Sequence, residues 1–293
     1  GVGRVTVRAK SVLSGHNDRY AVKTFAAKKR VLTPSATAAD RPYNGETGVA
    51  VSITLDNIAN HDEITATAAG AMMNADAGDE KIVYVSNITL SGDKKDCYTL
   101  SASALQTAVS IAPIAISGFT IAAEDKKYDG TVSAQASVTA INDVLPIDSG
   151  RVQVAGSAVF DTADSGTDKT VTFTASGLTG SKAANYTLSA AAMTASADHV
   201  TIMPLNVHFV IGQTSFIYDG TEKRITASAS DENGRIFRDF TVSYTDASGN
   251  DAVPNEAGTY TAAIALGDPT NYTSAQGSVT VTVAAATQDS LVI

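Results

Sequence analysis

The sequence has little from which a large aromatic core or a covalent crosslink could be built. Its 293 residues contain no Trp, one Cys and four Met, and aromatic residues make up 6%. The single thiol, Cys97, excludes a disulfide within the chain, and we expect it to be a small buried side chain. No apolar run approaches the roughly 18 residues that a membrane-spanning helix needs, so we expect no membrane insertion.

Basic residues are scarce as well. The chain carries 21 Lys and Arg against 30 Asp and Glu, which gives a formal net charge of −9. Nucleic acid is therefore not an expected partner, because phosphate binding needs a basic face. A mildly acidic surface instead suits a protein that stays soluble outside a cell.

Motifs for chemistry are also missing. The four histidines fall outside any His-Glu-x-x-His frame, and no Gly-x-Ser-x-Gly elbow occurs. Three acidic groups lack the spacing of a calcium loop: Asp56, Asp62 and Glu63; Asp143 and Asp148; and Asp161, Asp164 and Asp168. We therefore expect these acids to lie in solvated turns. We expect no catalytic residue, no cofactor and no metal site, with calcium binding and a Lys–Asn crosslink as open alternatives.

What dominates the chain is a pattern that occurs three times. An aromatic–Asx–Gly triplet, here called the first anchor, stands at Tyr43-Asn44-Gly45, Tyr128-Asp129-Gly130 and Tyr218-Asp219-Gly220. Its tyrosines are 85 (128 − 43) and 90 (218 − 128) residues apart. A second anchor tyrosine follows after 55 (98 − 43), 58 (186 − 128) and 54 (272 − 218) residues, at Tyr98, Tyr186 and Tyr272. Two anchors in fixed phase predict a tandem array of similar domains.

Short alternating segments lie between the anchors. In residues 169–174, Val171 and Phe173 face one way and the threonines face the other, which is the period of a half-buried strand. Further strand segments are expected at residues 3–9, 20–25, 49–55, 81–85, 107–111, 116–121, 151–154, 207–211, 258–262 and 278–283. The sequence therefore predicts an all-β fold, a tandem array of small Ig-like β-sandwich modules that forms an elongated rod.

The same patterns predict the domain boundaries. We expect modules at residues 29–113, 114–204 and 205–285, after a C-terminal remnant of a preceding Ig-like repeat at 1–28 and before a following segment or tail at 286–293. Pro113 and Pro204 each stand between the end of one strand and the start of the next. Because proline fixes φ and removes a donor, these short joints predict a semi-rigid rod.

The first anchor has the composition of a turn beside a packed ring. Asx before Gly tolerates the positive φ of tight turns, and a tyrosine can close the end of a sandwich while its hydroxyl reaches the backbone. The alternative is an exposed aromatic platform that stacks on sugars. On the structural interpretation the residues that matter are Tyr43, Gly45, Tyr98, Tyr128, Asp129, Gly130, Tyr186, Tyr218, Asp219, Gly220 and Tyr272.

Further motifs recur in order around the anchors. In the second module, Tyr128-Asp129-Gly130-Thr131 is followed by Gly-Thr-Asp-Lys-Thr-Val at 166–171, Leu-Thr-Gly at 178–180 and Ala-Asn-Tyr-Thr-Leu at 184–188. This order resembles the YDG repeat of large bacterial surface proteins. The first module resembles it with changes such as Cys97 in place of Asn, and the third is more similar to the related MBG repeat, with Ala257-Gly258-Thr259-Tyr260 and Asn271-Tyr272.

The resemblance implies an extracellular protein, on a bacterial cell surface or secreted, and an adhesin-like host chain. We expect the modules to be monomeric stalk or display elements without catalytic activity. The alternative is a carbohydrate- or protein-binding module that acts directly in adhesion, with a host glycan or protein as its unknown partner.

Overall fold

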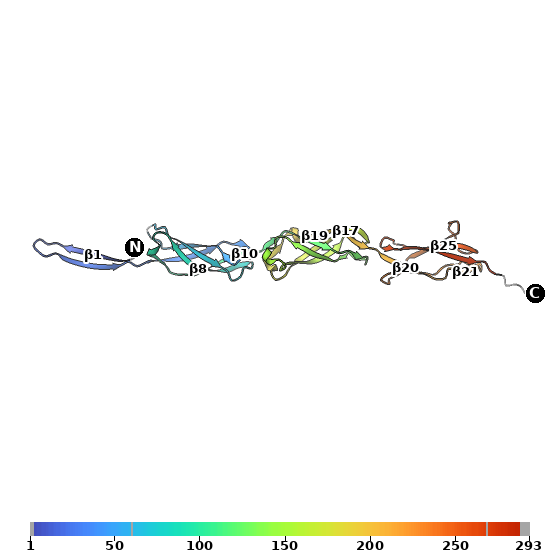
Figure 1. The fold of residues 1–293 in the computed structure, drawn as a ribbon, viewed down its shortest axis with the longest axis horizontal. Helices are drawn as coiled ribbons and strands as arrows, with labels where there is room; N and C mark the ends of the chain where they lie inside the picture. The colour runs from blue at the N-terminus through green and yellow to red at the C-terminus, as the bar shows by residue number, and fades with distance from the viewer. Residues whose placement is uncertain (1–2, 60, 268, 288–293) are drawn as a thin grey trace, which may run out of the picture. The chain divides into compact units, whose positions relative to one another are not determined.

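The structure, a computed structural model, describes residues 3–59, 61–267 and 269–287. Within these ranges the regular elements are β-strands and short 3-10 turns, joined by loops, which confirms the predicted all-β fold (Figure 1). The turns lie at Lys95–Cys97, Pro146–Asp148, Ala183–Asn185 and Ala190–Met193. Among the described residues, no helix has the length and apolar character needed to cross a membrane.

The chain divides into two compact units. Unit 1 comprises Gly1–Gly118, Ile141–Ala155 and Gly177–Ala192, and unit 2 comprises Phe119–Ala140, Gly156–Ser176 and Met193–Ile293. The division passes through the predicted module 114–204. Unit 1 therefore holds the first predicted module with the adjoining end of the second, and unit 2 holds the other end of the second with the third.

Unit 1 begins with an isolated hairpin. Strands β1 (Arg4–Ser11) and β2 (Arg19–Ala26) pair antiparallel along their whole length, from Arg4 opposite Ala26 to Ser11 opposite Arg19. Every residue of both strands is exposed, including Val5 and Phe25. The predicted strands at residues 3–9 and 20–25 are thus present, but neither face of the hairpin is covered by described residues.

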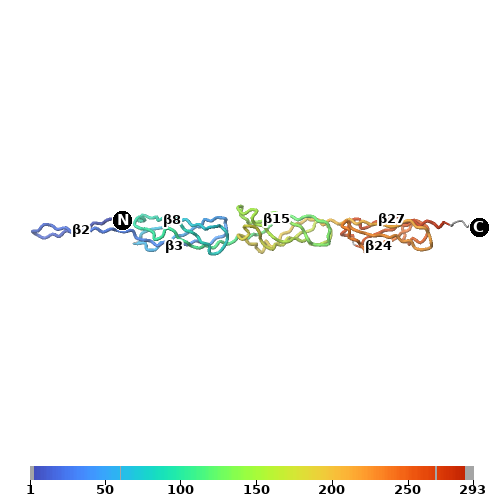
Figure 2. The backbone as a smooth tube through the Cα atoms, turned by 90° about the horizontal axis from the view of Figure 1, so that it is seen from below, coloured from blue at the N-terminus to red at the C-terminus, as the bar shows by residue number. Residues whose placement is uncertain are grey.

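The rest of unit 1 is built around a two-layered sandwich. One layer has the order β4-β10-β8-β7-β5 and the other β6-β3-β9, and Figure 2 shows β3 and β8 in different layers. The strands are β3 (Arg30–Ala38), β4 (Arg41–Pro42), β5 (Gly48–Val49), β6 (Val51–Asp56), β7 (Thr65–Ala71), β8 (Gly78–Ser91), β9 (Tyr98–Leu100) and β10 (Leu105–Ala112). Leu32, Val83, Val85, Val109 and Ile111 are almost fully buried.

Two predicted strands are interrupted. Segment 49–55 breaks at Ala50, because Val49 pairs with Gly70 in one layer while Val51 pairs with Ala38 in the other. A strand that changes layers in this way forms a corner of a sandwich. Segment 116–121 breaks between β11 (Ile114–Ile116) and β12 (Phe119–Ala123). There β11 pairs with β18 (Tyr186–Leu188), whereas β12 lies beside β15 (Ala136–Ile141).

Unit 2 repeats the plan. Its sheets have the orders β13-β19-β17-β16-β14, β21-β27-β25-β24 and β23-β22-β20-β26. The strands are β13 (Lys126–Lys127), β14 (Ser133–Ala134), β16 (Gln153–Phe160), β17 (Gly166–Thr179), β19 (Thr194–Met203), β20 (Leu205–Ile211), β21 (Ser215–Ile217), β22 (Ala227–Asp231), β23 (Ile236–Phe237), β24 (Phe240–Thr245), β25 (Gly258–Leu266), β26 (Tyr272–Thr273) and β27 (Gln276–Ala284). In β17, Val171 and Phe173 are buried and Thr174 is exposed, as the alternation predicts.

The two joints have the predicted form. Strand β10 ends at Ala112 and β11 begins at Ile114, while β19 ends at Met203 and β20 begins at Leu205. Only a proline separates the strands in each case. One residue with a fixed φ leaves little length for a hinge.

Candidate functional site

The three first anchors occupy the same structural position. In each, the short strand before the anchor runs parallel to the last strand of the sandwich: β4 beside β10, β13 beside β19, and β21 beside β27. The anchor tyrosine then donates its N–H to the final residue of that strand at 2.8 Å, from Tyr43 to Ala112, Tyr128 to Met203 and Tyr218 to Ala284. The anchor therefore stands at one end of each sandwich.

The Asx-Gly part of the anchor forms a tight turn. Gly45, Gly130 and Gly220 have φ values of +78°, +76° and +81°, a region that suits glycine. The Asp219 carboxylate accepts from the backbone N–H of Thr221 at 2.9 Å. Hydrogen bonds from Lys223 and then Thr221 hold the pKa of Asp219 well below its usual range.

In unit 1, the first anchor of one predicted module meets the second anchor of the next. The Tyr43 and Tyr186 rings are both buried and pack edge to face, with centroids 5.8 Å apart and an interplanar angle of 79°. Their hydroxyls both donate to Oδ2 of Asp148, at 2.9 and 2.8 Å. Asp148 is only 1% exposed, so this buried acid has its partners inside the cluster, as a buried polar group requires.

The cluster changes the acidity of its tyrosines. Burial, followed by the hydrogen bond to Asp148, raises the pKa of Tyr43 to about 12. Burial likewise raises the pKa of Tyr186, whose oxygen also accepts from the N–H of Leu145 at 3.1 Å. The Tyr43 hydroxyl therefore keeps its proton, and so remains a donor, up to strongly alkaline pH.

A buried asparagine next to Tyr186 adds directional contacts. The Oδ1 of Asn185 accepts from the N–H of Ala77 at 2.8 Å, and its Nδ2 donates to Asp76 at 3.0 Å. The Lys182 ammonium donates to the same Asp76 oxygen at 2.7 Å. Hydrogen bonds from Lys182 and then Asn185 hold the pKa of Asp76 below its usual value.

Unit 2 contains a second cluster with the same geometry. The Tyr128 and Tyr272 rings lie 5.7 Å apart at 80°. Asn271 accepts from the N–H of Ser165 at 2.7 Å and donates to Asp164 at 3.0 Å. The same arrangement therefore occurs in both clusters. An Asn-Tyr pair of one predicted module contacts a tyrosine, an acid and a backbone N–H of the preceding module.

The remaining two anchor tyrosines are placed differently. Tyr98 is buried, donates to Asp62 at 2.6 Å and accepts from the N–H of Ala59 at 3.2 Å. Cys97, which takes the place of the asparagine, is half-buried rather than buried as expected. Tyr218 is 37% exposed and does not close the end of its sandwich, since no other ring among the described residues packs against it.

Asp62 and Asp148, which the sequence predicts to be solvated turn acids, are placed differently in the structure. Each instead accepts a hydrogen bond from a second-anchor tyrosine. Their similar spacing could have identified them, because Asp62 precedes Tyr98 by 36 (98 − 62) residues and Asp148 precedes Tyr186 by 38 (186 − 148) residues. Within the described part of the chain, no group of three or more His, Cys, Asp or Glu side chains could hold a metal ion.

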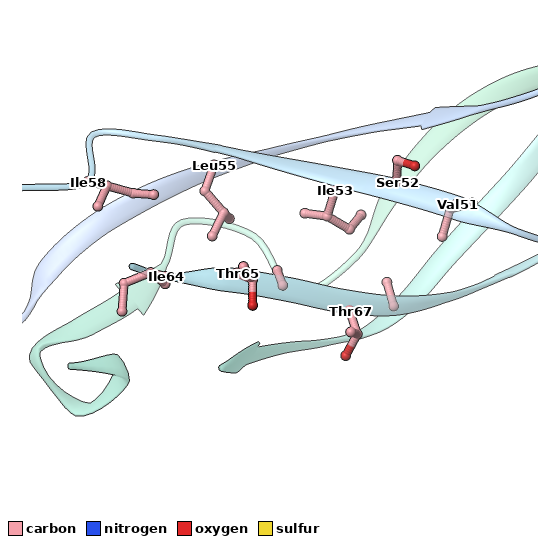
Figure 3. Close-up of a pocket in the computed structure, with 10 residues that line it drawn as sticks. Val51, Ser52, Ile53, Leu55, Ile58, Ile64, Thr65 and Thr67 are labelled. Carbon is pink, nitrogen blue, oxygen red and sulfur yellow. The ribbon is translucent and has the colours of Figure 1, made fainter. Parts of the chain in front are cut away.

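A shallow groove is another candidate site in unit 1. It has a volume of about 500 Å³ and lies between β6 and β7. Ile53, Leu55 and Ile58 line one side, while Ile64 and Thr65 lie on the other (Figure 3). None of the residues that line the groove is titratable, so the groove offers apolar contact without chemistry.

The comparisons with known proteins agree with the recurring anchors. The YDG domain matches the chain at residues 27–107 and 112–195, together more than half of the 293 residues. The chain belongs to the YDG domain family. Each YDG match contains one first anchor and one second anchor, which confirms the YDG resemblance of the first two predicted modules. The MBG type of the third module stays a prediction.

Other comparisons add little to the YDG assignment. A comparison with curated proteins finds no match. A solved structure described as "PcdhgB3 EC1-4 in 50 mM HEPES" is similar over 97% of this chain and 83% of that chain, with 9% sequence identity and a TM-score of 0.23. At that TM-score the likeness carries no argument about fold or function.

Proposed function

We propose that the chain is a non-catalytic spacer, made of two YDG modules and an MBG-type module, in an adhesin-like bacterial protein that is displayed on the cell surface or secreted. The observation that carries this proposal is the burial of the anchors. Tyr43, Tyr186 and Asn185 pack against residues of a neighbouring predicted module, so they stabilise joints and are not presented to a ligand.

Two features of the joints support a mechanical role. At each of the two joints, the side-chain amide of a buried asparagine accepts one hydrogen bond and donates another. A buried polar group that is satisfied in this way favours one geometry over others. Each joint also passes through a single proline. Both features oppose bending, which a spacer must resist.

Small-angle X-ray scattering tests the spacer role. Modules of about 35–45 Å, from strands of about 8–10 residues at a rise of roughly 3.3 Å, predict a maximum dimension on the order of 100–130 Å for the three together. A matched variant with eight Gly and Ser residues inserted after Pro113 should broaden the distance distribution. A maximum dimension close to that of one compact 30 kDa globule would contradict the proposal.

The groove in unit 1 favours a second candidate, direct binding of a glycan or protein. Its apolar wall at Ile53 and Leu55 is partly exposed, and partly exposed apolar surface is a common feature of recognition sites. Glycan arrays and calorimetry test it with Leu55→Asp and a matched variant, Thr54→Asp, at the exposed neighbouring position of β6 that does not line the groove. Binding lost only in Leu55→Asp supports the groove, whereas no binding by the unmodified chain rules it out for the ligands tried.

A further inference from the structure

Three sandwich ends share one strand register. At each end, three residues on neighbouring strands lie side by side. The middle one is the penultimate residue of the last strand of the sandwich. It pairs on one side with the glycine that begins a long strand, and on the other side with a residue of the short strand before the first anchor. The trios are Gly78, Ile111 and Arg41; Gly166, Ile202 and Lys126; and Gly258, Val283 and Phe216. The end that contains Tyr218 is therefore equivalent to the ends that contain Tyr43 and Tyr128.

The two residues before this glycine make the contacts to the Asn-Tyr pair. In unit 1 they are Asp76 and Ala77, which bond both sides of the Asn185 amide. In unit 2 they are Asp164 and Ser165, which bond Asn271 in the same way. At the third end the equivalent residues are Glu256 and Ala257, again an acid followed by a small residue.

At this third end the corresponding groups are free among the residues that the structure describes. The N–H of Ala257 and the hydroxyl of Tyr218 have no hydrogen-bond partner there. Glu256 and Ala257 are both exposed, and so is a third of the Tyr218 side chain. An aromatic face, a carboxylate and a backbone donor are thus arranged as in the two occupied ends.

We propose that Tyr218, Glu256 and Ala257 form a docking face for a further YDG-type module, joined after β27 as the second module is joined after β10. The occupant must carry an Asn-Tyr pair, with the asparagine bonding Ala257 and Glu256 and the tyrosine packing edge-on against Tyr218. A lysine placed like Lys182, which pairs with Asp76, would complement Glu256. The proposal goes beyond the spacer role, which stands whether or not this face binds a module.

The chain itself supplies a test module. Residues 113–204 contain Asn185, Tyr186, Asp148 and Lys182, which fill the equivalent end in unit 1. A second copy of this stretch fused directly after Ala284 recreates the Ala-Pro-Ile joint found at residues 112–114. Hydrogen exchange read by mass spectrometry then reports the Ala257 amide in the peptide 255–259.

Docking predicts that the fused copy slows exchange at Ala257 at least about fivefold, the factor expected for one hydrogen bond of about 1 kcal/mol. The matched control carries Asn185→Ala in the fused copy alone and should exchange as fast as the unextended chain. The peptide around Val171 has the same mass in both copies, so a single slowly exchanging population there shows that the fused copy has folded, whereas a second, fast population shows that it has not.

Exchange at Ala257 that is unchanged beside a folded copy overturns the proposal. If the copy of 113–204 does not fold, a copy of residues 204–284, with Asn271 and Tyr272, replaces it in the same measurement. Failure of both copies to protect Ala257 also counts against docking. Neither result affects the scattering test of the spacer role, so the two proposals fail separately.

Discussion

Replacing Tyr43 by Phe removes one oxygen atom from the buried cluster in unit 1. The ring contact with Tyr186 stays, but Asp148 loses one of the two hydroxyl donors to its Oδ2. Hydrogen bonds to charged groups contribute about 1.5–3 kcal/mol each. We therefore expect Tyr43→Phe to lower the free energy of unfolding of unit 1 by about 2 kcal/mol.

The second cluster provides a matched control. Tyr128 packs against Tyr272 with almost the same ring geometry, but the Tyr128 hydroxyl has no hydrogen-bond partner among the described residues. Tyr128→Phe keeps this ring contact and removes no hydrogen bond, so it should change the free energy of unfolding by less than about 0.5 kcal/mol.

Urea unfolding followed by circular dichroism measures both variants. For a domain of this size, about 2 kcal/mol corresponds to a fall in melting temperature of roughly 4–8 °C. A double-mutant cycle with Asp148→Asn assigns the loss, since Tyr43→Phe should cost much less once the acid is gone. Equal effects of Tyr43→Phe and Tyr128→Phe would refute the reasoning, because ring packing alone would then account for the cluster.

Three further predictions follow from individual groups. Because the pKa of Tyr43 is raised from 10.0 to about 12, its stabilising effect is complete below pH 10 and is lost as pH rises toward 12; absorbance at 295 nm should show a late-titrating tyrosine that Tyr43→Phe removes. The hydrogen bond that His199 donates to the Asp168 carboxylate raises the pKa of His199, so NMR should show His199 titrating above 6.5, and Asp168→Asn should reverse this. Gly180→Ala should lower the free energy of unfolding by more than about 3 kcal/mol in thermal melts, because φ is +109° and the new Cβ would lie 2.3 Å from a backbone oxygen. Gly234→Ala, which has open space around the new Cβ, should lower it by about 1 kcal/mol.

Much of the fold follows from local pattern. Val171 and Phe173 alternate with threonine and are buried as expected, because the two-residue period of a strand is a local property. The break at Ala50 was not predicted, since a change of layer depends on the pairing partners Gly70 and Ala38. Those partners come from distant parts of the chain, and alternation does not identify them.

The anchors show the same limit. Their spacing identified every tyrosine that the clusters use, and it predicted the turns at Gly45, Gly130 and Gly220. It did not reveal that Tyr43 meets Tyr186, which lies 143 (186 − 43) residues away. The sequence also predicted that Asp148 lies in a solvated turn. A carboxylate in a short 3-10 turn has the same sequence context whether it is exposed or buried.

The sequence by itself determined that this chain is a series of similar β-sandwiches with a tyrosine near each end, because repetition and strand period are written in residue order. Only the tertiary structure decided which tyrosine meets which. It also decided that Tyr218, unlike Tyr43 and Tyr128, has no second tyrosine ring packed against it among the residues that the structure describes. The physical reason is that packing and hydrogen bonding depend on distance in space, so equivalent residues acquire different environments when their neighbours differ.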